Sequence, residues 1–266
     1  MENDTIDPKK ILLFNDPDDD YNGLVGVTNC ITQQRLYSAY MQGVFPWFCE
    51  DEGEPVLWFS PNPRFCIRQG EFHTPKSVLK FLKKTPFEYT MDKDFSAVMD
   101  GCRKMKREGQ DGTWIGDMMM AAYEKFHENG FAHSVEVWHD GKLAGGLYGI
   151  LIGSVFCGES MFTVESDSAK SAFIIFARSF FDCGGKMIDS QVYTDNIARY
   201  GAQQMLRDEF LFYEQRLLRL PLVYDLKAVF ERNVESLKTT GKMLDKASIE
   251  SFDVSSCPLN SSSIPF

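Results

Sequence analysis

The stretch AHSVEVWHDGKLAGGLYGILIGSVFCGESMF (residues 132–162) decides the fold class of this chain. Ala132–Trp138 is rich in residues that favour strands, and HDGK (His139–Lys142) holds an Asp-Gly pair that is typical of a tight hairpin turn. Leu143–Leu151 and Ser154–Phe162 are predicted to form two further antiparallel strands. The sequence therefore predicts a meander of three antiparallel strands.

A helix, a strand and a second helix follow the meander. The first helix is predicted to begin near Ser166 or Asp167, since either residue is a suitable N-cap, and to end at Gly184-Gly185. The apolar run KMIDSQV (Lys186–Val192) then predicts a strand, and a further helix is expected within Asn196–Leu220. This order matches the sheet of GNAT-type acyltransferases, so the predicted fold is α/β (α+β) with a GNAT-like acyltransferase domain.

The KMIDSQV strand carries two polar residues in an apolar context. Side chains alternate between the two faces of a strand, so Asp189 and Gln191 are expected to share one face, opposite Ile188 and Val192. A carboxylate beside an amide on an interior strand indicates either a structural hydrogen-bond network or a catalytic pair.

Composition and cysteine usage narrow the class of protein. The chain has 266 residues, of which 44% are hydrophobic and 25% charged, as in ordinary globular proteins. No apolar run is long enough to span a bilayer, and the acidic N-terminus does not resemble a signal peptide, so no membrane association is expected. The seven cysteines are odd in number without CxxC spacing, and the four histidines lack metal-site spacing. We therefore expect a reducing, cytoplasmic location and no metal.

The net charge of −10 seems to disfavour nucleic acid, but the charge is unevenly distributed. Residues 1–20 hold seven acids and two lysines. Between Pro75 and Pro86, four lysines lie at helical spacing on one face, opposite Val78, Leu79 and Leu82; they are Lys76, Lys80, Lys83 and Lys84. A second basic cluster follows at 103–107. Such a stripe is either a solvated helix face or a surface that contacts phosphates.

Composition also suggests where the domains lie. Residues 1–66, rich in aromatic residues and prolines, are expected to form a smaller N-terminal domain, with Gly70 near the joint. Residues 67–226 are expected to form the GNAT-like domain. Residues 227–266 form a polar C-terminal extension, predicted as a helical stretch over 226–252 followed by a Ser-rich, partly disordered tail.

The fold alone would suggest acetyl-CoA as the donor, but the sequence argues against it. GNAT-type enzymes bind pyrophosphate at a Gly-rich turn that leads into the helix after the meander. Here that stretch is TVESDSAKSAF (Thr163–Phe173), which has no glycine and carries the acids Glu165 and Asp167. A pyrophosphate would be poorly bound there.

Several long motifs, in order over roughly residues 23–225, resemble the leucyl/phenylalanyl-tRNA–protein transferases. They are AYMQGVFPWF (Ala39–Phe48), LWFSPNPR (Leu57–Arg64), GTWI (Gly112–Ile115), HSVEVWHDGKLAGGLYG (His133–Gly149), FCGESMF (Phe156–Phe162) and IDSQV (Ile188–Val192). The resemblance implies a monomer without metal or cofactor. It implies transfer of Leu, also Phe or Met, from aminoacyl-tRNA to the N-terminal amine of proteins beginning with Arg or Lys, which marks these proteins for N-degron degradation.

The resemblance also implies roles for the polar residues. An aminoacyl ester is already activated, so the enzyme must position a neutral amine and stabilise the developing oxyanion rather than supply a nucleophile. In the family, Asp189 and Gln191 correspond to the pair that activates the amine. The Gln191 amide oxygen is expected to accept a hydrogen bond from the amine, and Asp189 to polarise and orient Gln191. Glu159 is the third catalytic candidate, expected to orient the substrate or to bind the basic acceptor.

The donor and its tRNA are expected to contact further residues. By resemblance, an apolar pocket for the donor side chain is lined by Leu147, Met161, Phe176 and Phe180. Trp47 and Trp114 correspond to tryptophans near the terminal adenosine of the tRNA, and Lys80, Lys83 and Lys84 to a basic region that contacts its backbone. Each apolar residue could instead be ordinary core. Leu147 replaces the usual Met of the family, and Ser190 stands where Cys is common.

Other functions remain open on the sequence alone. Cys157 beside Glu159 could be a thiol nucleophile, although no histidine is adjacent on its strand. An aminoacyl-tRNA-dependent cell-wall peptide transferase would share the fold, but the FCGESMF and DSQ motifs argue against it. A non-catalytic RNA-binding module would bind tRNA even after loss of Asp189 or Gln191.

Overall fold

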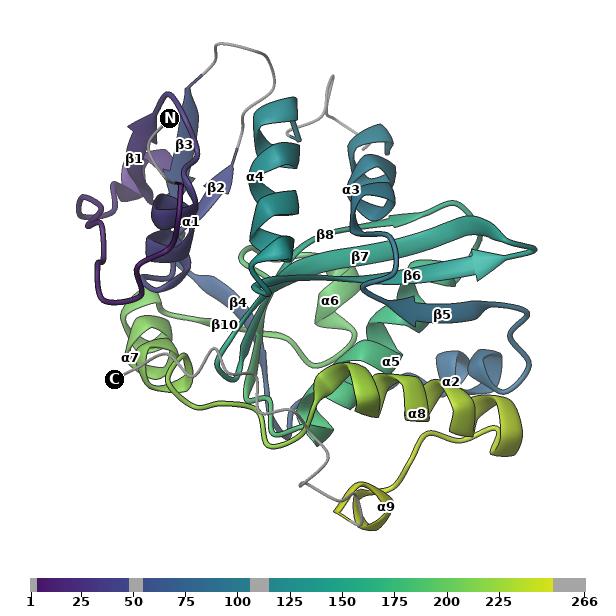
Figure 1. The fold of residues 1–266 in the computed structure, drawn as a ribbon. Coiled ribbons are helices and arrows are strands. Elements are labelled where there is room, and N and C mark those ends of the chain that lie inside the picture. The colour runs from purple at the N-terminus through teal and green to yellow at the C-terminus, as the bar shows by residue number, and fades with distance from the viewer. Residues whose placement is uncertain (1–3, 48–54, 106–114, 251–266) are drawn as a thin grey trace.

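The computed structural model describes residues 4–47, 55–105 and 115–250. The N-terminal part contains a three-stranded antiparallel sheet in the order β1-β3-β2, with helix α1 packed beside it (Figure 1). The elements are a 3-10 helix (Asp19–Tyr21), β1 (Leu24–Thr28), α1 (Gln33–Tyr40), β2 (Phe45–Trp47) and β3 (Val56–Phe59).

The rest of the chain is organised around a seven-stranded sheet in the order β10-β4-β9-β8-β7-β6-β5. Neighbouring strands are antiparallel, except that β8 and β9 run parallel. The strands are β4 (Arg64–Arg68), β5 (Glu88–Met91), β6 (Ala132–His139), β7 (Lys142–Ile152), β8 (Val155–Thr163), β9 (Met187–Asp189) and β10 (Gln203–Met205).

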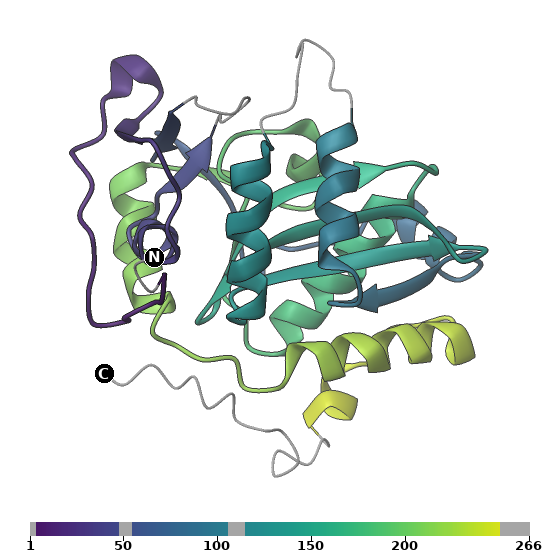
Figure 2. The same cartoon turned by 45° about the horizontal axis from the view of Figure 1, so that its top comes forward.

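Helices cover both faces of this sheet. Helices α3 and α4 lie on one face, and α2, α5 and α8 lie on the other, as both views show (Figures 1 and 2). Each face has its own cluster of buried apolar side chains. The helices are α2 (Lys76–Leu82), α3 (Phe95–Lys104), α4 (Asp117–Glu128), α5 (Ser168–Asp182), α6 (Asp195–Ala198), α7 (Arg207–Leu217), α8 (Leu226–Thr240) and α9 (Lys246–Glu250).

The predicted order of the central region is confirmed. Strands β6, β7 and β8 form the antiparallel meander, and Asp140 and Gly141 turn the first hairpin with φ of +48° and +74°. Helix α5 then crosses the sheet and returns the chain to β9, which pairs in parallel with β8. This is the GNAT-like arrangement that the sequence predicts.

Strand β9 is shorter than KMIDSQV suggests. It ends at Asp189, and Gln191 has a left-handed backbone conformation with φ of +62°. The backbone of Ser190 and Gln191 instead bonds to Phe65 of β4, because Ser190 N–H donates to Phe65 O and Phe65 N–H donates to Gln191 O. The expectation that Asp189 and Gln191 share one face of a strand is therefore wrong.

The C-terminal extension begins with a helix, but the predicted helical stretch over 226–252 is interrupted, because α8 ends at Thr240 and Gly241 has a left-handed backbone with φ of +70°. Its helix α8 is not polar all round, since five of its apolar side chains are buried against α5 and β5; they are Leu226, Val229, Phe230, Val234 and Leu237. The predicted tail over 251–266 lies outside the described residues. The domain boundary after residue 66 stays a prediction, and β4 runs across it. No helix among the described residues is long and apolar enough to cross a membrane.

Candidate active site

A cavity of about 600 Å³ opens between the N-terminal sheet and the seven-stranded sheet. Its walls come from β2, from the middle of β7 and β8, from the first half of α5, and from the segment after β9. The residues that line this cavity include Trp47, Leu147, Glu159, Met161, Phe173, Ile188 and Gln191. The structure therefore brings five of the twelve predicted site residues to one cavity; they are Trp47, Leu147, Glu159, Met161 and Gln191.

Glu159 enters the cavity from a bulge in β8. Strand β9 pairs with Val155–Cys157 of β8, whereas β8 runs on to Thr163. On its other side the register with β7 jumps by one residue after Gly158, which leaves Glu159 as the extra residue. A bulge changes the direction of a side chain, and bulges are frequent next to active sites.

The Glu159 carboxyl is buried and hydrogen-bonded on both oxygens. Its Oε1 accepts a hydrogen bond from Nε2 of Gln191 at 3.0 Å, and its Oε2 accepts one from the Tyr123 hydroxyl at 3.3 Å. The hydroxyls of Tyr123 and Tyr40 lie 2.5 Å apart. Burial raises the pKa of the Glu159 carboxyl to about 8, although the hydroxyls of Tyr40 and Tyr123 act in the opposite direction. Near neutral pH this carboxyl can hold or release a proton.

Gln191 is fixed through its backbone and its side chain. Its N–H donates to Oδ1 of Asp189 at 2.9 Å, and its backbone oxygen accepts from Phe65 N–H at 3.1 Å. Its side-chain Nε2 donates to Glu159, so its Oε1 is left to accept a hydrogen bond from a group in the cavity. An acceptor oxygen and a carboxyl with a raised pKa therefore stand side by side at the cavity wall.

Asp189 lies behind this wall rather than in it. Its side chain is fully buried, and both of its oxygens are bound by Arg64, with Nε to Oδ1 at 2.9 Å and Nη2 to Oδ2 at 2.6 Å. Asp189 is not among the residues that line the cavity. Asp189 is linked to the cavity through the N–H of Gln191, which donates to its Oδ1. In this position Asp189 does not contact an amine bound in the cavity.

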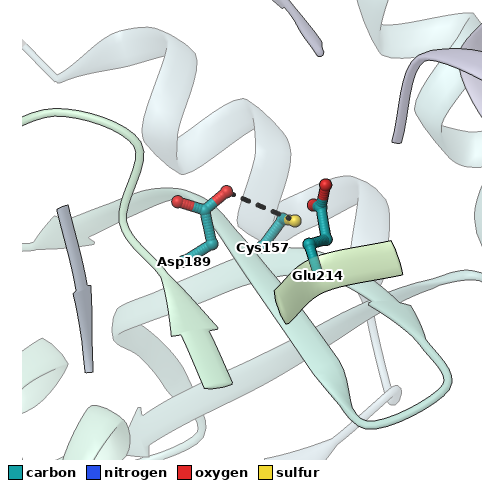
Figure 3. A group of neighbouring side chains, drawn as sticks. All are labelled: Cys157, Asp189 and Glu214. Atoms are coloured by element: carbon teal, nitrogen blue, oxygen red, sulfur yellow. Dashed lines mark hydrogen bonds between the residues drawn. The ribbon is translucent and has the colours of Figure 1, made fainter. Parts of the chain in front are cut away.

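Cys157 and Glu214 complete a buried group around Asp189 (Figure 3). Among the described residues, these three are the one set whose ligand atoms lie close enough to suggest a metal ion. Metal binding needs deprotonated ligands, but burial raises the pKa of the Cys157 thiol and of the Glu214 carboxyl well above their ordinary values. Arg64 already occupies both oxygens of Asp189. The group does not fit a metal site.

The same observations bear on Cys157 as a nucleophile. Its Sγ points to Oδ2 of Asp189 at 3.7 Å, and Cys157 is not among the residues that line the cavity. A buried thiol with a raised pKa is inert. The structure therefore argues against thiol catalysis.

The apolar part of the cavity holds Leu147 and Met161, together with Phe156, Phe173 and Ile188, which the sequence did not single out. Phe176 and Phe180 do not line it. They lie fully buried behind Phe156, with ring centroids 4.3 Å and 6.3 Å from its ring. The resemblance assigned Phe176 and Phe180 to the pocket lining, whereas the structure has them in the layer behind Phe156.

The predicted tRNA contacts are spread more widely. Trp47 is partly buried at the cavity, with its ring against Phe45 and Phe59, and Trp114 lies outside the described residues. Lys80, Lys83 and Lys84 are exposed on and just after α2 and form no ion pair with another described residue. Leu79, expected on the buried face of α2, is 40% exposed, so that Val78 and Leu82 form that face.

Three polar residues around the cavity were also not predicted from the sequence. Tyr40 and Tyr123 stand on α1 and α4 and meet above Glu159, and Arg64 is the last residue of the motif LWFSPNPR. In the sequence these residues are marked only by their polar groups. A polar group does not show which distant residue it will bind in the folded protein. Their roles follow from packing.

Comparisons with known proteins identify a family for this chain. Residues 66–215 match the family model described as leucyl/phenylalanyl-tRNA protein transferase, and residues 29–62 match that of its N-terminal domain. A leucyl/phenylalanyl-tRNA–protein transferase of Psychromonas ingrahamii is 40% identical over 234 residues, which cover 87% of this chain and 95% of the relative. One of Shewanella woodyi is 43% identical over 216 residues, covering 81% and 90%.

Among solved structures, a GCN5-related N-acetyltransferase from Kribbella flavida has a TM-score of 0.34 and 10% identity, and the match covers 64% of this chain and 60% of that one. This likeness is too weak to carry an argument. The family models match residues 66–215 and 29–62, and the two relatives are 40% and 43% identical over 87% and 81% of the chain. The chain therefore belongs to the leucyl/phenylalanyl-tRNA–protein transferase family.

Proposed function

We propose that this protein transfers leucine, and also phenylalanine or methionine, from aminoacyl-tRNA to the N-terminal amine of proteins that begin with Arg or Lys. The observation that carries the proposal is the Glu159–Gln191 pair at the wall of a cavity whose other end is apolar. The Arg and Lys acceptors, and the role in N-degron degradation, rest on the resemblance of the motifs to the family.

The apolar end of the cavity suits the donor side chain. Leu147, Met161 and Phe173 supply aliphatic, thioether and aromatic surface, and no described acid other than Glu159 lines the cavity. Shape and apolar contact alone discriminate weakly, since one methylene is worth about 1–3 kcal/mol. Leucine, phenylalanine and methionine are therefore expected to bind with similar affinities.

The polar end suits the acceptor amine. An α-amine has a pKa of about 8 and arrives largely protonated at neutral pH. Gln191 Oε1 accepts one N–H and orients the nitrogen, and the ionised form of Glu159, with its pKa near that of the amine, takes a proton from it. The neutral amine then attacks the ester carbonyl, the new C–N bond forms, and the C–O bond to the tRNA ribose breaks. The attacking nitrogen gives up a second proton as the amide forms, and the ribose oxygen leaves with it.

The tRNA is expected to approach past Trp47. Stacking of a base on an aromatic side chain contributes about 1–3 kcal/mol and tolerates any base identity. The lysines at 80, 83 and 84 supply charge for backbone phosphates in a chain that is otherwise acidic. Trp114 stays a candidate for the same terminal adenosine. The protein is proposed to act as a monomer in the cytoplasm. The cytoplasmic location is consistent with the described cysteines, which form no disulfide with one another; they are Cys30, Cys66, Cys102, Cys157 and Cys183.

A transfer assay read by mass spectrometry tests the proposal. Leu-tRNA, Phe-tRNA and Met-tRNA are each mixed with peptides that begin with Arg, Lys, Asp or Ala. The expected product is a peptide longer by one donor residue, only with Arg or Lys at its start, and absent with Gln191→Ala. Asp189→Ala is a poorer variant, because it leaves Arg64 buried without its partner at a cost of about 3–5 kcal/mol.

Each outcome of this assay is informative. Transfer to the Asp peptide instead would support aminoacyl transfer but refute the proposed preference for acceptors that begin with Arg or Lys. Absence of transfer to every peptide, with Leu-tRNA still bound by wild type and by Gln191→Ala, would refute the enzyme and favour an RNA-binding module.

A further inference from the structure

Arg64 is an arginine with almost no access to solvent. Its side chain is 1% exposed, and its Nη1 donates to Gly43 O at 2.9 Å while Nε and Nη2 bind both oxygens of Asp189. The guanidinium carbon lies 4.9 Å from the ring centroid of Phe45 and 4.5 Å from that of Phe210. The guanidinium is planar, packs against both rings and donates three hydrogen bonds in fixed directions. These contacts together restrict it to one orientation.

The fixed guanidinium in turn fixes the Asp189 carboxylate. Both carboxylate oxygens are engaged in a bidentate pair, so rotation of the carboxylate would break two short hydrogen bonds. Oδ1, the oxygen bound by Nε of Arg64, also accepts the N–H of Gln191 at 2.9 Å. The position of this oxygen is therefore set by Arg64.

The hydrogen bond to Asp189 helps to hold Gln191 in an unfavourable backbone conformation. A left-handed conformation costs a residue other than glycine about 1–2 kcal/mol, and Gln191 has φ of +62°. A hydrogen bond to a charged group contributes about 1.5–3 kcal/mol, which is enough to offset that cost. With its backbone so held, Gln191 donates from Nε2 to Glu159 at the wall of the cavity.

We propose that Arg64 is a positioning residue, which orients Asp189 and through it keeps Gln191 in the conformation that receives the acceptor amine. The inference rests on the proposed function for its kinetic consequence. Its structural consequence, the hydrogen bond between Gln191 N–H and Asp189, does not depend on that function.

A simpler role for Arg64 is to neutralise the buried charge of Asp189. The two roles differ in what a lysine can replace. Lysine keeps the positive charge but lacks the planar fork, so it cannot hold both oxygens of Asp189 and Gly43 O in one geometry. If charge alone matters, Arg64→Lys retains full activity. If orientation matters, Arg64→Lys retains the fold and loses turnover.

The experiment compares Arg64→Lys with Arg68→Lys. Arg68 is a matched control, since it stands on the same strand, β4, and binds the Glu71 carboxylate through Nε and Nη2, away from the cavity. We expect Arg64→Lys to lower the single-turnover rate of leucine transfer at least tenfold while the Kd for Leu-tRNA changes less than threefold. Arg68→Lys should change neither. Wild-type turnover in Arg64→Lys would overturn the inference.

Amide hydrogen exchange at Gln191 gives a readout that is independent of activity. We expect its N–H to exchange at least tenfold faster in Arg64→Lys than in wild type, because its acceptor is no longer held. Unchanged exchange at Gln191 would overturn the inference even if turnover fell. If the wild-type protein transfers no leucine, the proposed function fails, and the exchange experiment still decides the role of Arg64.

A second pair of variants covers the case in which Arg64→Lys does not fold. Asp189→Asn is compared with the double variant Arg64→Met, Asp189→Asn, in which no buried charge is left alone. If Arg64 acts through Asp189, the turnover rate of the double variant should equal that of Asp189→Asn, because Asp189 is already altered in both. A further tenfold loss in the double variant would overturn the inference.

Discussion

Replacing Glu159 by glutamine should change how the stability of the protein depends on pH. In the folded protein, burial raises the pKa of this carboxyl from 4.5 to about 8. The folded state therefore binds one more proton than the unfolded state between these two pH values. The stabilisation that this proton gives is fully present below pH 4.5 and is lost as the pH rises through about 8. Gln191 and Tyr123 can still bond to a glutamine at this position.

The magnitude follows from linkage. Each pH unit between the two pKa values lowers the free energy of unfolding by about 1.4 kcal/mol. Integrated from pH 5.5 to pH 8, with half of the carboxyls ionised at the upper limit, the loss is about 3 kcal/mol. Glutamine does not titrate, so the stability of Glu159→Gln relative to wild type should rise by this amount over the same interval.

Urea unfolding at several pH values, followed by circular dichroism, measures this difference. Glu128→Gln on α4 is the control, because it makes the same chemical change at an exposed position on the helix that carries Tyr123. The difference between Glu159→Gln and wild type should grow with pH, whereas that of Glu128→Gln should stay flat. Parallel curves for Glu159→Gln and wild type would refute the assignment of a buried, protonated Glu159.

Three further predictions concern the substrates. Trp47→Ala should weaken Leu-tRNA binding by about 1–3 kcal/mol in a filter-binding assay, and an unchanged Kd would exclude stacking on this residue. Leu147→Met should change the ratio of kcat/KM for Met-tRNA to kcat/KM for Leu-tRNA, by an amount that corresponds to no more than about 3 kcal/mol of activation free energy. An unchanged ratio would show that the donor side chain does not contact this residue. Replacing Lys80, Lys83 and Lys84 by Gln should reduce the slope of log K against log salt by about 0.9 for each tRNA phosphate that these lysines neutralise, and an unchanged slope would make this stripe a solvated helix face.

The central sheet could be predicted because its determinants are local. The Asp-Gly turn at 140–141 and the strand-forming residues around it define the hairpin, and helical spacing defines α5. The turn after β9 could not be predicted in the same way. Its left-handed Gln191 is stabilised by Phe65 and Asp189, and Phe65 is more than a hundred residues away in the chain.

The site shows the same division. The FCGESMF and DSQ motifs pointed to Glu159, Asp189 and Gln191, but alternation along a strand placed Asp189 and Gln191 on one face, whereas the structure has Gln191 at the cavity wall and Asp189 behind it. Arg64 explains the difference, because a bidentate pair holds Asp189 in the interior. The bulge that directs Glu159 depends on the register of β7 with β8, which no single strand reveals.

The most direct test of the proposed chemistry is the single-turnover rate of leucine transfer by Gln191→Ala at saturating Leu-tRNA, with Gln204→Ala as control. Gln204 is exposed on β10, away from the cavity lining. We predict that Gln191→Ala binds Leu-tRNA as wild type does but forms the peptide bond at least a hundredfold more slowly. Gln204→Ala should behave as wild type in both respects. Peptide-bond formation at the wild-type rate in Gln191→Ala would contradict the proposed chemistry.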